Sequence, residues 1–272
     1  MYLSRHLTAG GPRWALDGLY LPAAFTLDLL LQSPAEDAIP LLEGLSRGET
    51  AEDPLMPPVE PALEVWASGV TYEMSREARM FESTEADIYE KVYDAERPEL
   101  FFKALGHRVV GHGEVVRVRA DSHWNVPEPE LVLVLNGRME IVGYTAGDDV
   151  SSRDIEGENP LYLPQAKIYD GSCAIGPGIV VPAASDDLRD LPIGLRVYRD
   201  GGLVFEGETS TSRIKRPLQE LGEYLGKELS LPNGALLMTG TGIVPDEDFT
   251  LTPGDRVEIS VGDLGLENEV TV

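Results

Sequence analysis

The stretch NVPEPELVLVL, residues 125–135, restricts the fold more than any other part of the chain. Its second half is a continuous apolar run typical of a buried strand, yet two prolines and two carboxylates open it. Successive side chains of a strand point to opposite faces, so Glu128 and Glu130 project side by side from one face. Two ionised carboxylates this close repel each other, and an Arg, a Lys or a divalent metal ion must offset their charge.

The residues after this strand predict a second strand that returns beside it. Asn136–Gly137 is a strong hairpin signal, and the run that follows it ends in GDDVSSRD. Because a hairpin brings its outer ends together, we expect Asp148 or Asp149 to return to the Glu pair. Three converging carboxylates suit Mg²⁺ or Mn²⁺, whereas zinc sites usually recruit the His or Cys that this cluster lacks. The alternative is a solvated strand start followed by a turn, because acidic pairs are common in an acidic chain.

The rest of the chain predicts a β-rich domain with few helices. The stretches EVVRVRAD (114–121) and RVEISV (256–261) alternate apolar and polar residues, as half-buried strands do. The stretch LRVYRDGGLVFEG (195–207) predicts a hairpin that turns at Asp200–Gly201. One amphipathic helix is expected after Pro217. Its apolar face consists of Leu218, Leu221, Leu225 and Leu229.

A domain boundary is expected near residue 61. Residues 1 to about 50 combine short apolar runs with a predicted helix across FTLDLLLQ and AEDAIPLLEGL, whose leucines recur at helical spacing. The stretch GETAEDPLMPPVEP, residues 48–61, then has the Pro-rich and acidic composition of a linker. We therefore predict a small N-terminal domain and linker, residues 1–61, followed by a catalytic domain, residues 62–272.

Composition argues against several classes of partner. No apolar run approaches the roughly 20 residues of a membrane span, and the N-terminus MYLSRHLTAGGPRW lacks the apolar core of a signal peptide. The single Cys173 cannot form an internal disulfide, which favours a cytoplasmic location. A net charge of −25 repels nucleic acid and anionic membranes, so a small molecule is the expected partner. The same excess of acid also suits a salt-rich cell interior.

Seven motifs occur in the order and approximate spacing of the fumarylacetoacetate hydrolase family, which the chain resembles over residues 65–272. They are GVTYEMSREA, PELFFKALG, VPEPELVLVL, GYTAGDDVSSRD, PQAKIYDGSCAIGP, LLMTGTGIV and LTPGDRVEI. The resemblance implies an α+β, β-rich fold with a mixed β-sandwich roll, and a homodimer or homotetramer. It also implies that Glu128, Glu130 and Asp149 hold Mg²⁺, with Mn²⁺ as the alternative.

One departure from the family pattern narrows the expected chemistry. Hydrolases of the family usually carry Gly-x-Asn-Tyr-x-x-His near the start of the domain, where the His helps to activate water. This chain has GVTYEMS, with Ser75 at the position of that His, and a serine alone is no base for that step. The histidines of the chain lie outside the motif, and we expect them on the surface or in loops. They are His6, His107, His112 and His123.

The sugar-acid dehydratase branch of the family resembles this chain better. TYEMSREARMFES, YDAERPELFFK and SSRDIEGENPLYLPQAKIY are similar to the 2-keto-3-deoxy-D-arabinonate dehydratases. The resemblance implies the dehydration of such a 2-keto acid to 2,5-dioxopentanoate in pentose degradation. The alternative is a hydrolase or decarboxylase of acylpyruvate-like 2-keto acids on the same metal site. A third hypothesis is a non-enzymatic regulator that binds a sugar acid or a metal.

The family pattern also implies roles for individual residues. Lys167, in PQAKIYDG, is the candidate for proton transfer, because a Lys beside a metal ion in a partly dry site gives up its proton more easily. We expect Glu128 to share this step, and Ser75 or Glu82 to orient the leaving hydroxyl. The alternative for Lys167 is a surface residue that pairs with the acidic excess.

Further residues carry weaker expectations. Thr241, in TGTG, is the candidate to hold the substrate carboxylate, and a tight glycine turn is the alternative. Arg153 either forms an ion pair that shapes the Asp149 loop, which we favour, or contacts the substrate. Lys103, in FFK, is a candidate substrate contact, and Cys173 is expected to be buried and unreactive. Ser151 and Ser152 are expected to cap the loop. The aromatic residues expected in the core are Tyr72, Phe81, Phe101 and Phe102.

Overall fold

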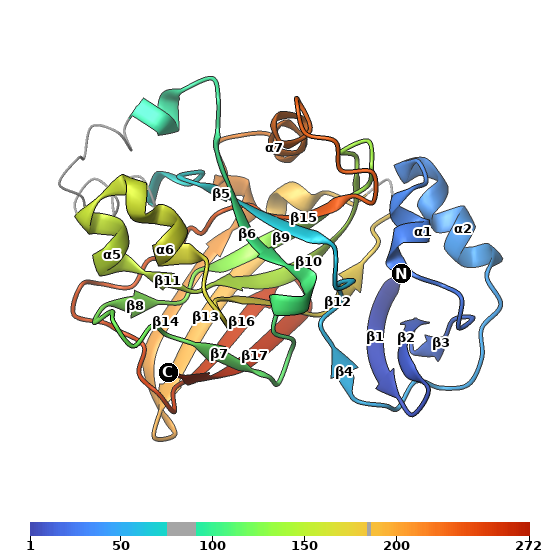
Figure 1. The fold of residues 1–272 in the computed structure, drawn as a ribbon, viewed down its shortest axis with the longest axis horizontal. Coiled ribbons are helices and arrows are strands. Elements are labelled where there is room, and N and C mark those ends of the chain that lie inside the picture. Colours follow the sequence, from blue (N-terminus) through green and yellow to red (C-terminus); the bar gives the residue numbers. More distant parts are fainter. Residues whose placement is uncertain (75–90, 184–185) are drawn as a thin grey trace.

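The computed structural model describes residues 1–74, 91–183 and 186–272, which form mainly strands (Figure 1). A ten-stranded mixed sheet contains most of the strands, and a five-stranded sheet packs against it. The large sheet runs in the order β3 (Leu19–Tyr20), β2 (Gly11–Leu16), β1 (Tyr2–Thr8), β12 (Cys173–Val180), β10 (Ile141–Asp149), β9 (Pro129–Leu135), β15 (Ala235–Met238), β5 (Glu64–Gly69) and β6 (Glu99–Leu105), with β4 (Leu55–Met56) beside β1. The expected α+β, β-rich class is confirmed.

The remaining strands form two smaller sheets, and the helices are short. The five-stranded sheet has the order β14 (Gly202–Ser210), β13 (Pro192–Arg199), β16 (Arg256–Val261), β17 (Leu264–Thr271) and β7 (Val115–Arg117). A two-stranded ribbon joins β11 (Ser151–Ser152) to β8 (Asn125–Val126). The helices whose full length is described are α1 (Leu27–Leu31), α2 (Ala38–Gly44), α5 (Arg153–Glu158), α6 (Leu163–Lys167) and α7 (Leu218–Leu225). Single 3-10 turns are η1 (Ala35–Asp37), η2 (Gly106–Arg108), η3 (Pro160–Tyr162), η4 (Leu188–Asp190) and η5 (Thr211–Arg213).

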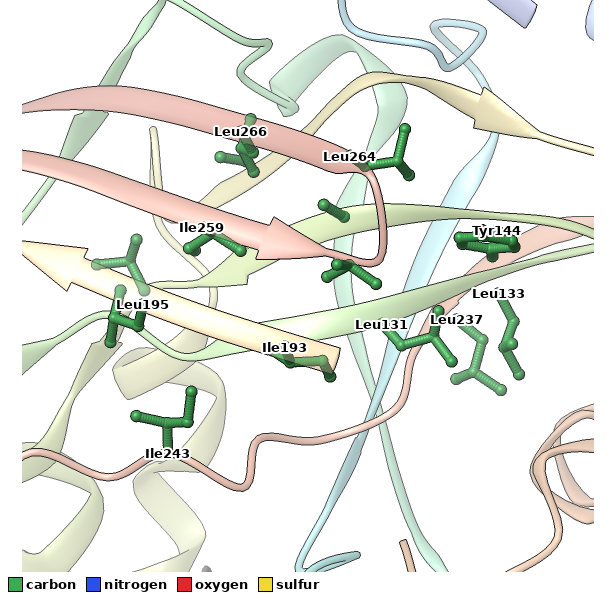
Figure 2. Packing of buried hydrophobic residues seen from close by; sticks show 14 of the residues in the cluster. Leu131, Leu133, Tyr144, Ile193, Leu195, Leu237, Ile243, Ile259, Leu264 and Leu266 are labelled. Carbon is green, nitrogen blue, oxygen red and sulfur yellow. The ribbon is translucent and has the colours of Figure 1, made fainter. Parts of the chain in front are cut away.

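Strand β9 is buried along its whole length, which explains its continuous apolar sequence. Leu131 and Leu133 point into the core between the two sheets, where they meet residues such as Ile259 of the five-stranded sheet (Figure 2). Val132 and Val134 point the other way, into a second core that α1 and α2 cover. The strand therefore has no polar face, and carboxylates at its start are carried into the interior.

Two predicted hairpins are present. The β13–β14 hairpin turns at Asp200–Gly201, and both residues have positive φ, 51° and 79°, as a type I′ turn requires. The β9–β10 connection is longer than the Asn136–Gly137 signal suggested, since it spans residues 136–140. The Asn136 side chain closes this loop, because its Oδ1 accepts from the backbone N–H groups of Arg138 and Glu140, both at 2.9 Å.

The N-terminal strands extend the large sheet of the catalytic region. Strand β1 pairs antiparallel with β12, in the register of Tyr2 opposite Val180 and Leu3 opposite Ile179. The division into domains at residue 61 stays a prediction, but residues on both sides of it share one sheet and one core. The expected N-terminal helix consists of two short helices, α1 and α2, with η1 between them.

Two expectations about single residues are wrong. Leu229 does not belong to the apolar face of α7, because the helix ends at Leu225 with Gly226 as its C-cap, and the Leu229 side chain is 38% exposed. His6 is neither in a loop nor on the surface, because it lies buried in β1. Its Nε2 is 2.8 Å from Ser4 Oγ and its Nδ1 is 2.7 Å from the Asp53 carbonyl oxygen, so both ring nitrogens are satisfied. No helix in the described part of the chain is long and apolar enough to cross a membrane.

The shared core predicts the effect of truncating Leu3, whose side chain is fully buried in β1. Leu3→Ala should destabilise the protein by about 2–5 kcal/mol, because it removes buried methyl groups and leaves a cavity. Thermal unfolding should remain a single transition at a lower melting temperature. Leu7→Ala on the same strand is the control, since Leu7 is 52% exposed and should change little. A separate early transition in Leu3→Ala would instead indicate that the N-terminal region unfolds on its own.

Candidate metal and substrate site

Three carboxylates converge where strand β9 begins beside the end of strand β10. The antiparallel register places Glu130 opposite Gly147 and Pro129 opposite Asp148. Glu128, Glu130 and Asp149 each bring an oxygen within 4.8 Å of the other two, and all three side chains are buried. The predicted return of an Asp to the Glu pair is confirmed, and the alternative of a solvated strand start is wrong.

Asp149, and not Asp148, joins the cluster, because neighbouring residues of a strand face opposite sides. Asp148 is fully buried, and its Oδ1 accepts from the Glu128 backbone N–H at 2.9 Å. Burial raises the pKa of Asp148 to about 7, and the nearby charge of Asp149 adds to the shift. Asp148 therefore supports the backbone of a cluster residue from the other side of the strand.

Cationic side chains surround the cluster. Lys167 Nζ lies 2.8 Å from Glu128 Oε2, 3.0 Å from Asp149 Oδ2 and 2.6 Å from Ser151 Oγ. Arg153 reaches Glu128 Oε1 at 3.2 Å, and Lys103 forms an ion pair with Asp149 Oδ1. All of these side chains are buried, so the alternative of Lys167 as a surface residue is wrong.

The cluster fits a hard divalent cation. Burial raises the pKa of Glu130 well above its usual range, and the charges of Asp149 and Glu128 raise it further. The described ion pairs of these cations go to Glu128 and Asp149. A divalent ion held by the three carboxylates would place positive charge beside Glu130 as well, and carboxylate oxygens are the donors that Mg²⁺ prefers. The residues that would hold it are Glu128, Glu130 and Asp149.

A backbone turn holds Glu130 in place. Its Oε2 accepts from the Gly240 N–H at 2.6 Å. Gly240 has a φ of +88°, and a Cβ at this position would lie 2.2 Å from Thr71 Oγ1, so only glycine fits this close approach. The Thr241 hydroxyl bonds within the same turn, to the N and O of Ile243 at 3.2 Å, as expected for a tight glycine turn.

The cluster opens into a small cavity between β5, β6, α5 and α6. Its wall consists of Ser68, Gly69, Val70, Glu99, Phe101, Glu128, Glu130, Asp149, Glu156, Leu163, Lys167, Gly240 and Thr241. Thr241 is therefore placed where it can meet a substrate. Within the described residues, neither Arg153 nor Lys103 belongs to this wall. Ser75, Phe81 and Glu82 lie outside the described residues.

The sequence prediction missed several residues of this wall. Glu156 lies one helical turn after Arg153 in α5, and Glu99 begins β6 with its carboxylate against Gly69. Phe101 was expected only as a core residue, yet its ring lies 5.8 Å from Lys167 Nζ at the cavity. The helical spacing of Arg153 and Glu156 was a usable signal, whereas nothing local in the sequence marks Glu99.

The structure also places the other residues that were expected in the core or in a loop. Tyr72 is buried, and Phe102 packs edge-on against Trp66 with ring centroids 5.8 Å apart. Ser151 and Ser152 are buried in the short strand β11, and their hydroxyls donate to Asp149 O and Asn125 Oδ1. Cys173 is buried, and that burial raises the pKa of its thiol to about 12, which agrees with the expected lack of reactivity.

The chain is similar to a known protein family and to individual known proteins. The fumarylacetoacetate (FAA) hydrolase C-terminal family matches residues 64–271. A probable 2-keto-3-deoxyxylonate dehydratase of Haloferax volcanii is 50% identical over 211 residues, which are 77% of this chain and 73% of that protein. A 2-dehydro-3-deoxy-D-arabinonate dehydratase of Saccharolobus solfataricus is 49% identical over 215 residues, 76% of this chain and 71% of that protein.

A solved structure is similar over the whole chain. It is a 2-keto-3-deoxy-D-arabinonate dehydratase complexed with magnesium and 2,5-dioxopentanoate, with a TM-score of 0.83 and 38% identity. The similarity covers 100% of this chain and 99% of that chain. The apo form gives a TM-score of 0.87 at the same identity.

The raised pKa of Asp148 predicts a pH-dependent stability difference in metal-free protein. Between about pH 4 and pH 7 native Asp148 keeps a proton that the unfolded chain has lost, so this group's contribution to stability falls as the pH rises through that window. Asp148→Asn keeps the Oδ1 acceptor and does not titrate. The free energy of unfolding of Asp148→Asn, relative to that of wild type, should therefore increase by on the order of a few kcal/mol between pH 4 and pH 8. This follows because one pKa unit corresponds to about 1.4 kcal/mol.

Urea unfolding in EDTA at several pH values measures this difference. Asp121→Asn is the control, because Asp121 is exposed and a hydrogen bond from Arg119 lowers its pKa. That control should show no such gain at high pH. A constant difference between wild type and Asp148→Asn across the range would contradict the prediction.

Proposed function

The chain belongs to the fumarylacetoacetate hydrolase family, and we propose that it is a Mg²⁺-dependent dehydratase that converts 2-keto-3-deoxy-D-arabinonate into 2,5-dioxopentanoate. The main support for this proposal is the buried cluster of Glu128, Glu130 and Asp149, which lies at a cavity with Lys167 beside it. Over about three quarters of its length the chain is also about half identical to two sugar-acid dehydratases. Such an enzyme is a hydro-lyase, and it eliminates water without an external oxidant or reductant.

The atoms balance in a simple way. The substrate loses a hydrogen from C3 and the hydroxyl group from C4, which together leave as one water. C5 and its hydroxyl group then each lose a proton, while C3 and C4 each gain one. This turns the C5 alcohol into the aldehyde of the product. When bound, Mg²⁺ withdraws electron density from the 2-keto oxygen and so makes the C3 hydrogens acidic.

The protein supplies proton transfer and orientation. We assign Lys167 Nζ as the base for the C3 proton, since it lies at the cavity wall and Ser151 Oγ holds it at 2.6 Å. Glu128 Oε2, 2.8 Å from the same nitrogen, exchanges a proton with it. Val70, Phe101 and Leu163 form the apolar part of the wall and limit the access of water to these groups.

Substrate contacts complete the proposal. Thr241 is assigned to the substrate carboxylate, supported by its place on the cavity wall beside Gly240. Ser75 and Glu82 are assigned to the leaving hydroxyl on the resemblance to the dehydratases alone. Arg153 is assigned mainly to holding Glu128, because that ion pair is buried. A direct contact of Arg153 with the substrate remains the alternative.

The biological setting is also part of the proposal. We place the enzyme in the cytoplasm, which its single buried Cys173 supports, and assign it a small 2-keto acid as partner, with no role for nucleic acid or membrane. We propose a homodimer or homotetramer, on the family resemblance. The catalytic domain is assigned to residues 62–272, which agrees with the family match over residues 64–271.

The reaction is tested by its product. Purified protein given 2-keto-3-deoxy-D-arabinonate and Mg²⁺ should form 2,5-dioxopentanoate, and in deuterated water the product should carry deuterium at C3 and C4. Mass spectrometry identifies both, and an added semialdehyde dehydrogenase gives a continuous NAD(P)H signal. Pyruvate with a two-carbon aldehyde would indicate an aldolase. Turnover of acylpyruvates alone would favour the hydrolase or decarboxylase alternative.

Variants of Lys167 link this product to the site. Lys167→Ala should lower kcat by on the order of 100-fold or more, with a smaller change in KM, because a general base acts only in the chemical step. Lys215→Ala is the control, since Lys215 lies at the surface in an ion pair with Asp94 and should leave both constants near wild type. Unaltered turnover in Lys167→Ala would remove Lys167 from the mechanism.

The metal requirement is a separate prediction. EDTA should abolish turnover and added Mg²⁺ or Mn²⁺ should restore it, whereas Glu128→Gln and Asp149→Asn should not be rescued by either ion, because a neutral amide is a poor ligand for a hard cation. Calorimetric titration of metal-free protein measures the Mg²⁺ affinity directly. Asp121→Asn, an exposed carboxylate outside the cluster, should bind Mg²⁺ as wild type does. Full activity in EDTA would exclude the metal mechanism.

A further inference from the structure

Lys103 on β6 is buried beside the candidate metal ligands, but it does not face the cavity. Its side chain has no exposed surface, and among the described residues it is absent from the cavity wall. A substrate in the cavity therefore has no direct path to its ammonium group. The described cavity wall gives no support to the expectation that Lys103 contacts the substrate, which stays a prediction, and the buried charge of Lys103 needs another explanation.

The ammonium group of Lys103 meets three acceptors. It forms an ion pair with Asp149 Oδ1 and donates to the Lys167 carbonyl oxygen at 2.6 Å and to the Val150 carbonyl oxygen at 3.3 Å. The two carbonyl oxygens accept hydrogen bonds from the ammonium, and Asp149 supplies the opposite charge. A buried cation with two hydrogen bonds and a carboxylate partner is held in one place.

These contacts connect two groups of the proposed mechanism. Lys103 pairs with Oδ1 of Asp149, while Oδ2 of the same carboxylate lies 3.0 Å from Lys167 Nζ. At Lys167, Lys103 holds the carbonyl oxygen of the last residue of α6. Helix α6 has only five residues, too few to be stable alone, so its end depends on such tertiary contacts.

We propose that Lys103 is a positioning residue, which fixes Asp149 Oδ1 and the backbone of Lys167 so that Asp149 Oδ2 and Lys167 Nζ face the reaction site. The proposal rests on the proposed function for the roles of Asp149 and Lys167. Lys103 itself touches neither the substrate nor the reacting atoms. Its loss should disturb metal binding and the chemical step together, and leave substrate binding nearly unchanged.

The test compares Lys103→Met with wild type by calorimetry and by steady-state kinetics. In metal-free protein, Mg²⁺ affinity should fall about 10–100-fold, the usual effect of losing a residue that orients a metal ligand. The kcat measured at saturating Mg²⁺ should fall by a similar factor, because Lys167 is no longer held, while KM changes less than about 3-fold. Lys215→Met, an exposed lysine in an ion pair with Asp94, is the matched control.

A second variant covers the case in which Lys103→Met does not fold. Lys103→Arg keeps the positive charge beside Asp149, but its planar guanidinium cannot point donors in the same three directions. Lys103→Arg should fold, as judged by circular dichroism. Its losses of Mg²⁺ affinity and of kcat should be smaller than those of Lys103→Met, with kcat lowered about tenfold and KM nearly constant. Wild-type values in Lys103→Arg would overturn the proposal.

Other outcomes are equally decisive. Tighter Mg²⁺ binding in Lys103→Met would mean that Lys103 only offsets charge. A raised KM with wild-type kcat would make it a substrate contact, and wild-type affinity and kcat with a lower melting temperature would make its role purely structural. Absence of dehydratase turnover in wild type would reject the proposed function, yet the Mg²⁺ affinities would still test the contact with Asp149.

Discussion

The burial of three carboxylates within 4.8 Å of one another is the constraint on which the rest of the site depends. Their mutual repulsion in a medium of low polarity is large, so the cluster persists only with positive charge placed around it. Lys167, Arg153 and Lys103 supply that charge from α6, α5 and β6. Each of these elements is thereby tied to the ends of β9 and β10. The fold around the cavity is thus arranged by electrostatics as much as by apolar packing.

Apolar packing in turn fixes where the carboxylates lie. Strand β9 presents leucines to one core and valines to the other, so a shift of its register by one residue would move every side chain into the wrong core. Gly147 of β10 reinforces this register, because a Cβ there would lie 2.5 Å from Val132 Cγ2 and no larger residue fits. The paired strands therefore hold Glu130 and Asp149 in fixed relative positions before any ligand binds, which is the preorganisation that a metal site requires.

Local patterns predicted the parts of the site that a single hairpin brings together. The spacing of Glu128 and Glu130 and the Asn136–Gly137 signal predicted that an Asp returns to the Glu pair, whereas the choice of Asp149 over Asp148 came from the family resemblance. Lys103 and Glu99 could not be assigned in this way, because β6 reaches the site through its pairing with β5, a contact between strands distant from the hairpin. The burial of His6 was missed for a similar reason, since its partners Ser4 and Asp53 satisfy a polar ring that sequence alone places at the surface.

The net charge of −25 and the chemistry of the cavity impose opposite demands on an anionic substrate. At long range the acidic surface repels a 2-keto acid, and dissolved salt weakens this repulsion beyond about 8–10 Å. Lys167 is buried at the cavity wall, so its charge and that of a divalent ion held by the carboxylates would be screened less than surface charges are. An acidic protein can therefore bind an anion when its cations are concentrated at one buried point. The ion pairs that hold those cations beside the carboxylates then serve both the stability of the site and its selectivity for a negatively charged ligand.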